Sequence, residues 1–156
     1  MLFNFSCSDL NFDVVVVGGG TSGVASAIQS SRLGSKTLLI EESNWLGGML
    51  TSAGVSAVDG NYKMPSGFLK EFRDSLVSYY GHLDSLKTGW VSNFMFEPSV
   101  GNRILKDIAK QENNLTILYG STVSEVVKKE NFSIKVNELP SLYKAKILID
   151  ATELGD

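Results

Sequence analysis

The sequence predicts an α/β fold in which a parallel sheet with helices forms a Rossmann-like nucleotide-binding domain. A run of mostly β-branched apolar residues at 12–17 shows no alternation, which is typical of a parallel strand covered on both faces. Three consecutive glycines follow it, and small and apolar residues then recur at helical spacing over 21–33. A second apolar strand at 37–40 completes a strand, helix, strand unit.

The rest of the chain adds a long loop, two helices and more strands. Residues 43–66 are rich in glycine and too long for an ordinary connector, so we expect this loop to be functional. Helices are expected at 67–80 and 97–111, where apolar residues recur on one side. Four strands are expected near the end, at 115–119, 122–129, 132–138 and 143–149. Those between 122 and 138 suggest a small β-meander on the main sheet.

Composition indicates one globular domain, taken as residues 1–156, and excludes several classes of function. The 14 basic and 17 acidic residues form no long run, so we expect neither a nucleic-acid nor a membrane partner. No apolar run approaches the roughly 20 residues of a membrane span. A single cysteine, Cys7, and a single histidine, His82, rule out a common zinc set, and we expect no metal. A lone cysteine favours a reducing compartment, so the expected location is cytoplasmic.

A glycine motif follows the first strand. Gly18, Gly20 and Gly23 match GxGxxG, which supplies a sharp turn, an approach of backbone to a pyrophosphate, and close packing of helix on sheet. Alone, the motif fits a turn without a ligand equally well. Its position between a strand and a helix favours a dinucleotide. The helix would begin at Thr21, Ser22 and Gly23, where free amides and the helix dipole favour a pyrophosphate.

An acidic residue ends the second strand, close to the expected ~20 residues after the motif. We predict that Glu41 accepts hydrogen bonds from both ribose hydroxyls, each worth about 1.5–3 kcal/mol. Its charge would repel a 2′-phosphate, which makes NADP the least favoured dinucleotide. Glu42 is the alternative candidate, although its place one step past the strand is also typical of a solvated loop residue.

The segments DVVVVGGGTSGVASAIQSSRLGSKTLLIEES, WLGGMLTSAG and ILIDATELGD together resemble the large FAD-dependent oxidoreductase family built on the glutathione-reductase-type flavin domain. The resemblance covers nearly the whole chain in motif order. It is strongest to bacterial members with an LGGM-like loop and an ATE or ATG plus GD ending. The resemblance implies an enzyme that binds FAD noncovalently and transfers a hydride or electron pair to or from a small-molecule substrate.

The same resemblance implies further cofactor-binding residues. In the family, a pair such as Gly47 and Gly48, followed here by Met49, lets loop backbone pass beside the pyrophosphate and ribityl chain. The competing interpretation is a turn that needs left-handed residues. The first strand of the family's meander contacts adenine through its backbone, here near Val123.

The closing residues resemble the family's second flavin motif. Ala151, Thr152, Gly155 and Asp156 match a strand end and Gly-Asp turn that face the phosphate and ribityl portion. Glu153 stands where many relatives have glycine, which departs from the pattern of the turn.

The family's sequence normally continues past this motif into a substrate domain, so we expect residues 1–156 to be an incomplete FAD-binding domain. A missing domain or a homo-oligomer is then the expected macromolecular partner. No catalytic residue is assigned, because His82 lacks a partner carboxylate at recognisable spacing. Two alternatives stay open: an NAD-binding enzyme similar to thiazole synthase, and a truncated nucleotide-binding module without turnover.

Overall fold

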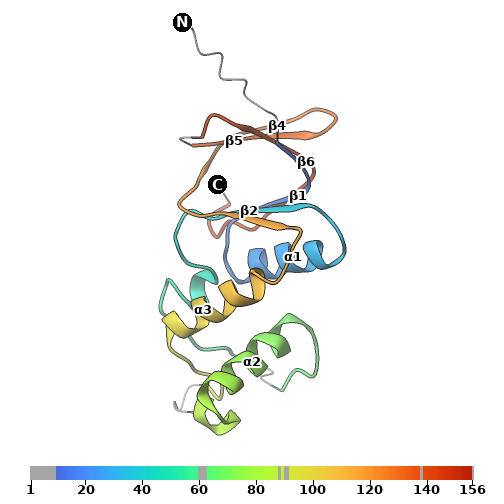
Figure 1. Ribbon diagram of the computed structural model, residues 1–156. Coiled ribbons are helices and arrows are strands. Elements are labelled where there is room, and N and C mark those ends of the chain that lie inside the picture. The colour runs from blue at the N-terminus through green and yellow to red at the C-terminus, as the bar shows by residue number, and fades with distance from the viewer. Residues whose placement is uncertain (1–9, 60–62, 88, 90–91, 138, 156) are drawn as a thin grey trace, which may run out of the picture.

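The computed structural model describes residues 10–59, 63–87, 89, 92–137 and 139–155. The predictions that involve Cys7, Glu138 and Asp156 therefore lie outside the described residues. The elements follow one another along the chain as shown in Figure 1: β1 (Leu10–Val17), α1 (Thr21–Arg32), β2 (Thr37–Ile40), the short 3₁₀ helix η1 (Gly48–Leu50), α2 (Gly67–Tyr80), a second 3₁₀ helix η2 (Leu83–Leu86), α3 (Pro98–Ala109), β3 (Leu115–Leu118), β4 (Val123–Lys128), β5 (Phe132–Val136) and β6 (Leu142–Asp150).

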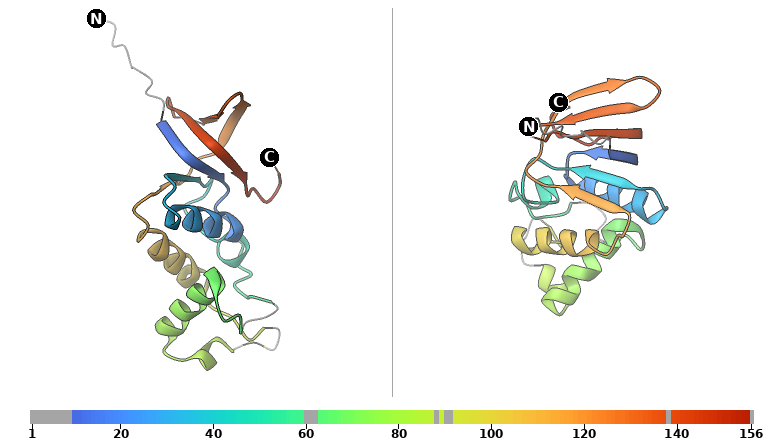
Figure 2. Two further views of the ribbon diagram at one scale, coloured as in Figure 1. Left: turned by 90° about the vertical axis from the view of Figure 1, so that its right-hand side faces the viewer. Right: turned by 45° about the horizontal axis from the view of Figure 1, so that its top comes forward.

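A single six-stranded sheet, in the order β3-β2-β1-β6-β5-β4, organises the chain (Figure 2). β1 pairs in parallel with β2 on one side and β6 on the other, and β3 extends the parallel part beyond β2. β5 runs antiparallel to β6, and β4 antiparallel to β5. The predicted α/β class and meander are confirmed. The meander joins the main sheet because β6 pairs with β5 and β1 at once.

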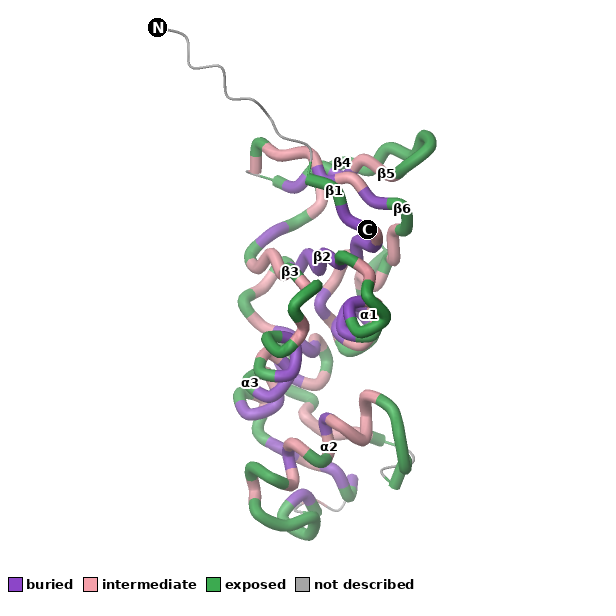
Figure 3. Tube along the Cα trace, turned by 45° about the vertical axis from the view of Figure 1, so that its right-hand side comes forward, coloured by how far each residue is buried: buried purple, intermediate pink, exposed green. Residues whose placement is uncertain are grey.

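Two apolar cores cover the two faces of β1. Val14 and Val16 pack toward the helices, whereas Val15 belongs to a core on the opposite face. This explains the absence of alternation in the sequence of β1. Figure 2 shows α1 and α3 on one side of the sheet, with α2 beyond them, and Figure 3 shows buried positions concentrated along α1, α3 and the central strands. The second core draws residues from β1, β2, β5 and β6.

Helix and strand ends differ from the predictions by a few residues. α1 stops at Arg32 because Gly34 adopts a φ of +91°, and Leu33 becomes its C-cap. α3 begins at Pro98, which suits the first turn of a helix, and ends at Ala109. Beyond that point the Gln111 amide bonds to Ile108 instead of continuing the α-helical pattern. β6 extends to Asp150, and the two 3₁₀ helices were not predicted.

An arginine connects the helices of the helical layer. The Arg32 guanidinium forms two hydrogen bonds with the Glu71 carboxylate of α2 and one with Glu112 after α3, all at 2.7 Å. These hydrogen bonds from Arg32 lower the pKa of Glu71 against the opposing effect of its burial. Within the described residues, no helix is long and apolar enough to cross a bilayer.

Candidate nucleotide-binding site

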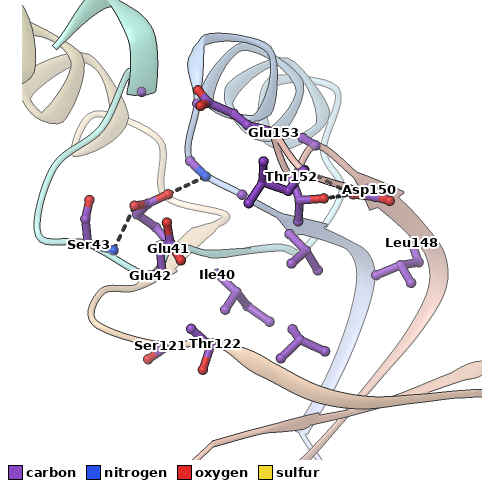
Figure 4. A pocket seen from close by; sticks show the side chains of 18 of the residues that line it. Ile40, Glu41, Glu42, Ser43, Ser121, Thr122, Leu148, Asp150, Thr152 and Glu153 are labelled. Atoms are coloured by element: carbon purple, nitrogen blue, oxygen red, sulfur yellow. Dashed lines mark hydrogen bonds between the residues drawn. The ribbon is translucent and has the colours of Figure 1, made fainter. Parts of the chain in front are cut away.

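A pocket of about 640 Å³ lies at the carboxyl ends of β1, β2 and β6 (Figure 4). Its far wall is the segment 121–126, which leads into β4. β1 has β2 and β6 on its two sides, so the pocket sits where the strand order reverses, and ligands of open α/β sheets bind at such points. The volume is within the range of small-molecule sites.

The three motif glycines have different structural roles. Gly18 has a φ of +97°, and a Cβ there would lie 2.5 Å from the carbonyl oxygen of Ala151. A Cβ on the buried Gly23 would lie 1.8 Å from the carbonyl oxygen of Gly18, so this residue permits close packing of α1 on the turn. At Gly20 the nearest atom to a Cβ is 3.6 Å away, and the residue lines the pocket. Gly20 is therefore the motif position that leaves space for a ligand.

The amino end of α1 opens onto this space. Gly20 is its N-cap and provides no side-chain hydrogen bond, and its first turn has no acidic residue. The first amides of a helix lack intrahelical partners and attract anions. The side chains of Thr21 and Ser22 are exposed and do not line the pocket, and Thr21 Oγ1 donates to the Gly47 carbonyl at 3.0 Å. Only the backbone at these two positions is suited to a ligand.

A second glycine loop is attached to the first. The Gly47 amide donates to the Gly19 carbonyl at 2.8 Å, and Gly47 bridges to Gly20. Gly47 and Gly48 have φ values of +109° and +50°, so the interpretation as a turn that needs left-handed residues is correct. Gly48 lines the pocket, whereas the buried Gly47 packs against one side chain from α3 and one at the end of η1. Met49 is 55% exposed and does not line the pocket.

Glu41 is the buried carboxylate of the pocket. Its Oε2 accepts a hydrogen bond from the Gly19 amide at 2.6 Å, and its Oε1 accepts one from the Ser43 amide at 2.8 Å. The side chain therefore connects the end of β2 to the glycine turn. Each carboxylate oxygen accepts one of these hydrogen bonds and has the capacity to accept another. Burial raises the pKa of Tyr119, and the nearby charge of Glu41 raises it further. Glu42 also lines the pocket but is exposed.

The turn after β6 forms despite its departure from the family pattern. Asp150 accepts hydrogen bonds from the Thr152 amide at 3.0 Å and hydroxyl at 2.7 Å, which lower the pKa of Asp150. The Gly155 amide donates to Thr152 Oγ1 at 3.1 Å, and Gly155 has a φ of +72°. Ala151 and Thr152 line the pocket, whereas Gly155 does not. The positive φ falls on Gly155, so Glu153 is accommodated without strain.

The structure brings together about half of the predicted site. Eight of the predicted residues line the pocket: Gly18, Gly20, Glu41, Glu42, Gly48, Val123, Ala151 and Thr152. Six predicted residues lie nearby without lining it: Thr21, Ser22, Gly23, Gly47, Met49 and Gly155. His82 is exposed and lies outside the pocket, where its Nδ1 accepts the Asp84 amide at the start of η2. This supports a surface histidine near a helix end and not a catalytic base.

Other lining residues were not predicted. Gly19 is one of them, and a Cβ at this position would lie 2.6 Å from Glu41 Oε2. Others lie at or just after strand ends, including Ser43, Ser121 and Asp150, and the rule that ligands bind at the carboxyl ends of parallel strands could have found them. Among the described lining residues, no cation is present, while carboxylates occur at five positions: Glu41, Glu42, Glu125, Asp150 and Glu153. Within the described residues, no cluster suits a metal ion.

Comparison with known proteins identifies the family. The family model described as FAD dependent oxidoreductase matches residues 13–156. The chain belongs to the FAD dependent oxidoreductase family. This confirms the resemblance drawn from the glycine turn, the second glycine loop and the closing motif, and it favours the flavoenzyme over the NAD-binding alternative. Family membership does not assign individual residues to the cofactor, so those assignments stay predictions.

Relatives of this FAD dependent oxidoreductase family member differ widely in name. It is 29% identical over 148 residues to digeranylgeranylglycerophospholipid reductase of Methanococcus vannielii, a match that covers 90% of this chain and 38% of the relative. It is 42% identical over 69 residues to glutathione reductase of Debaryomyces hansenii, covering 44% of this chain and 14% of the relative. The chain thus spans well under half the length of these relatives.

Solved structures support the fold. The closed crystal structure of cyclohexanone monooxygenase matches with a TM-score of 0.62 and 17% identity, over 93% of this chain and 26% of that one. At this identity the likeness concerns the fold alone. It agrees with the Rossmann-type arrangement of sheet and helices described above.

Proposed function

We propose that this chain binds FAD noncovalently in the pocket and forms the nucleotide-binding part of a flavoenzyme that acts on a small molecule. The observation that carries the proposal is the open space beside Gly20. Its Cα borders open space at the amino end of α1, while the neighbouring Gly18 and Gly23 are packed against backbone. Such a surface of bare backbone suits a pyrophosphate, which needs amide donors and close approach.

The other residues fit the remaining parts of FAD. Glu41 would hold the adenosine ribose, since its carboxylate lines the pocket and each oxygen already accepts only one amide. Val123, at the start of β4, would contact adenine, and Ile40 adds an apolar surface to that end. Gly48, Ala151 and Thr152 would face the ribityl chain and its phosphate. When bound, FAD supplies hydride or electron-pair chemistry.

The partners of the whole protein are part of the same proposal. The parts that orient a substrate would come from a further domain or a second subunit, because the family's relatives are much longer than the matched region. We propose a small-molecule substrate and neither a nucleic-acid nor a membrane partner, since the pocket is acidic and the chain carries a net charge of −3. The proposed compartment is the cytoplasm.

The test is the identity of the nucleotide that the purified full-length protein carries. Its visible absorption spectrum is recorded, and the nucleotide released on denaturation is identified by chromatography. A yellow protein that releases FAD supports the proposal. A colourless protein that releases NAD would refute the proposal and favour the NAD-binding alternative. A protein that holds FAD but passes electrons to no acceptor would favour the module without turnover.

A further inference from the structure

Glu153 places a carboxylate at the junction of the two glycine loops. Its Oε1 lies 3.6 Å from the Cβ position of Gly20 and 2.5 Å from that of Gly48. Apart from the adjacent backbone, no other atom of the described residues comes within 4 Å of the Cβ position of Gly20. Figure 4 shows the Glu153 side chain beside the start of α1. The space that distinguishes Gly20 from the other motif glycines is therefore bordered by this carboxylate.

The electrostatic setting explains why an anionic group lies there. The first turn of α1 has no acidic residue and its N-cap has no side-chain hydrogen bond, so the partial positive charge of the helix end is not balanced within α1 itself. Glu153 brings a negative charge to this end from the turn after β6. Among the described residues, the carboxylate has no hydrogen-bond or ion-pair partner. No hydrogen bond or ion pair with that part of the chain therefore fixes its position.

A pyrophosphate at the same helix end would meet this carboxylate at short range. The described residues lining the pocket carry five carboxylates and no cation, so no basic side chain there offsets the repulsion. From this juxtaposition we propose that Glu153 occupies the position of the cofactor pyrophosphate, must rotate away for FAD to bind, and thereby lowers the affinity for FAD. The inference rests on the proposed function, and it adds a residue that sets how tightly the cofactor is held.

Substitution of Glu153 tests the proposal in the full-length protein after its flavin has been removed. FAD is titrated into wild type, Glu153→Gln and Glu153→Gly, and the dissociation constant is followed by the change in flavin fluorescence. Glu153 is exposed and has no positive φ, so both variants are expected to fold. We expect Glu153→Gln to bind FAD at least about fivefold more tightly, the factor for removing one unit charge about 4 Å from another in water. The difference from wild type should shrink in 1 M salt, where the Debye length falls to about 3 Å.

The matched control is Glu130→Gln, which removes the same charge from the exposed β4–β5 turn, outside the pocket. It should leave the affinity for FAD unchanged. The proposal is overturned if Glu153→Gln binds FAD as wild type does or more weakly, or if Glu130→Gln tightens binding equally. These results differ from a failure of the proposed function, in which wild type itself would bind no FAD.

Discussion

Gly20→Val separates cofactor binding from folding, because the structure shows space for the new side chain. Gly20 has φ −61° and ψ −179°, which valine adopts readily, and beyond the adjacent backbone the described residues place no atom closer than 3.6 Å to its Cβ position. The cost to folding is that of a poorer N-cap, about 0.5–1 kcal/mol. For a chain of this size that corresponds to a fall in Tm of roughly 1–4 °C.

The effect on binding should be far larger. A branched side chain at this position fills the space into which a pyrophosphate must come to reach the amides of α1. The loss of two charge-assisted hydrogen bonds, at about 1.5–3 kcal/mol each, gives roughly 3–6 kcal/mol. That weakens FAD binding by about 10²- to 10⁴-fold. Flavin content of the purified protein and titration of the flavin-free protein measure this loss, and a thermal melt measures the change in stability.

Gly34→Ala is the matched control for Gly20→Val. Gly34 follows the opposite end of α1, has a φ of +91° and lies outside the pocket. Alanine there pays the strain of a left-handed backbone, about 1–2 kcal/mol, so its Tm should fall at least as much. Its flavin content should nevertheless equal that of wild type. Wild-type flavin content in Gly20→Val would show that the pyrophosphate does not lie on this turn.

Three further predictions concern carboxylates and their partners. Glu41→Ala should weaken FAD binding severalfold or more and lower the Tm, because two amides lose their acceptor. Glu42→Ala should change little. Equal effects of the two variants in FAD titrations would mean that the wrong carboxylate was chosen. Gly19→Ala should reproduce the Glu41→Ala loss, since its Cβ would lie 2.6 Å from Glu41 Oε2, and wild-type FAD affinity would contradict the geometry. Arg32→Met should lower the Tm more at pH 7 than at pH 3. The lowered pKa of Glu71 contributes stability that is fully present above its unfolded value, near 4.5, and is lost as pH falls through the lowered folded value, so an equal Tm difference at both pH values would exclude this linkage.

The sequence predicted those parts of the site that depend on local backbone. Gly18 and Gly23 are required by contacts at 2.5 Å and 1.8 Å that no other residue permits, so their spacing carries information about the turn. Glu41 was predictable because the end of a short parallel strand places its side chain beside the preceding turn. The helices and strands followed from periodicity, and their errors of one or two residues occur at the ends of elements, where Gly34 ends α1 and Pro98 begins α3.

The far wall of the pocket was not predictable in the same way. Ser121 and Thr122 face the glycine turn only because β3 adds to the edge of the sheet beside β2, a pairing between residues some 80 positions apart in the chain. Met49 shows the opposite error. The motif suggested a contact, but a 3₁₀ turn directs its side chain to solvent. Side-chain direction in a loop depends on such turns, and sequence patterns carry little information about them.

The distribution of charge in the pocket constrains how an anionic cofactor is held. With five carboxylates and no cation among the described lining residues, binding must depend on neutral donors at short range, namely the amides of α1 and of the two glycine loops. The long-range field of these carboxylates would repel an anionic cofactor instead of attracting it. This is why we expect Gly20→Val to weaken binding strongly, since amide hydrogen bonds reach only about 3 Å and a branched side chain there would block them. It is also the basis for the proposed effect of Glu153, because a carboxylate there lies in the space that the pyrophosphate would need.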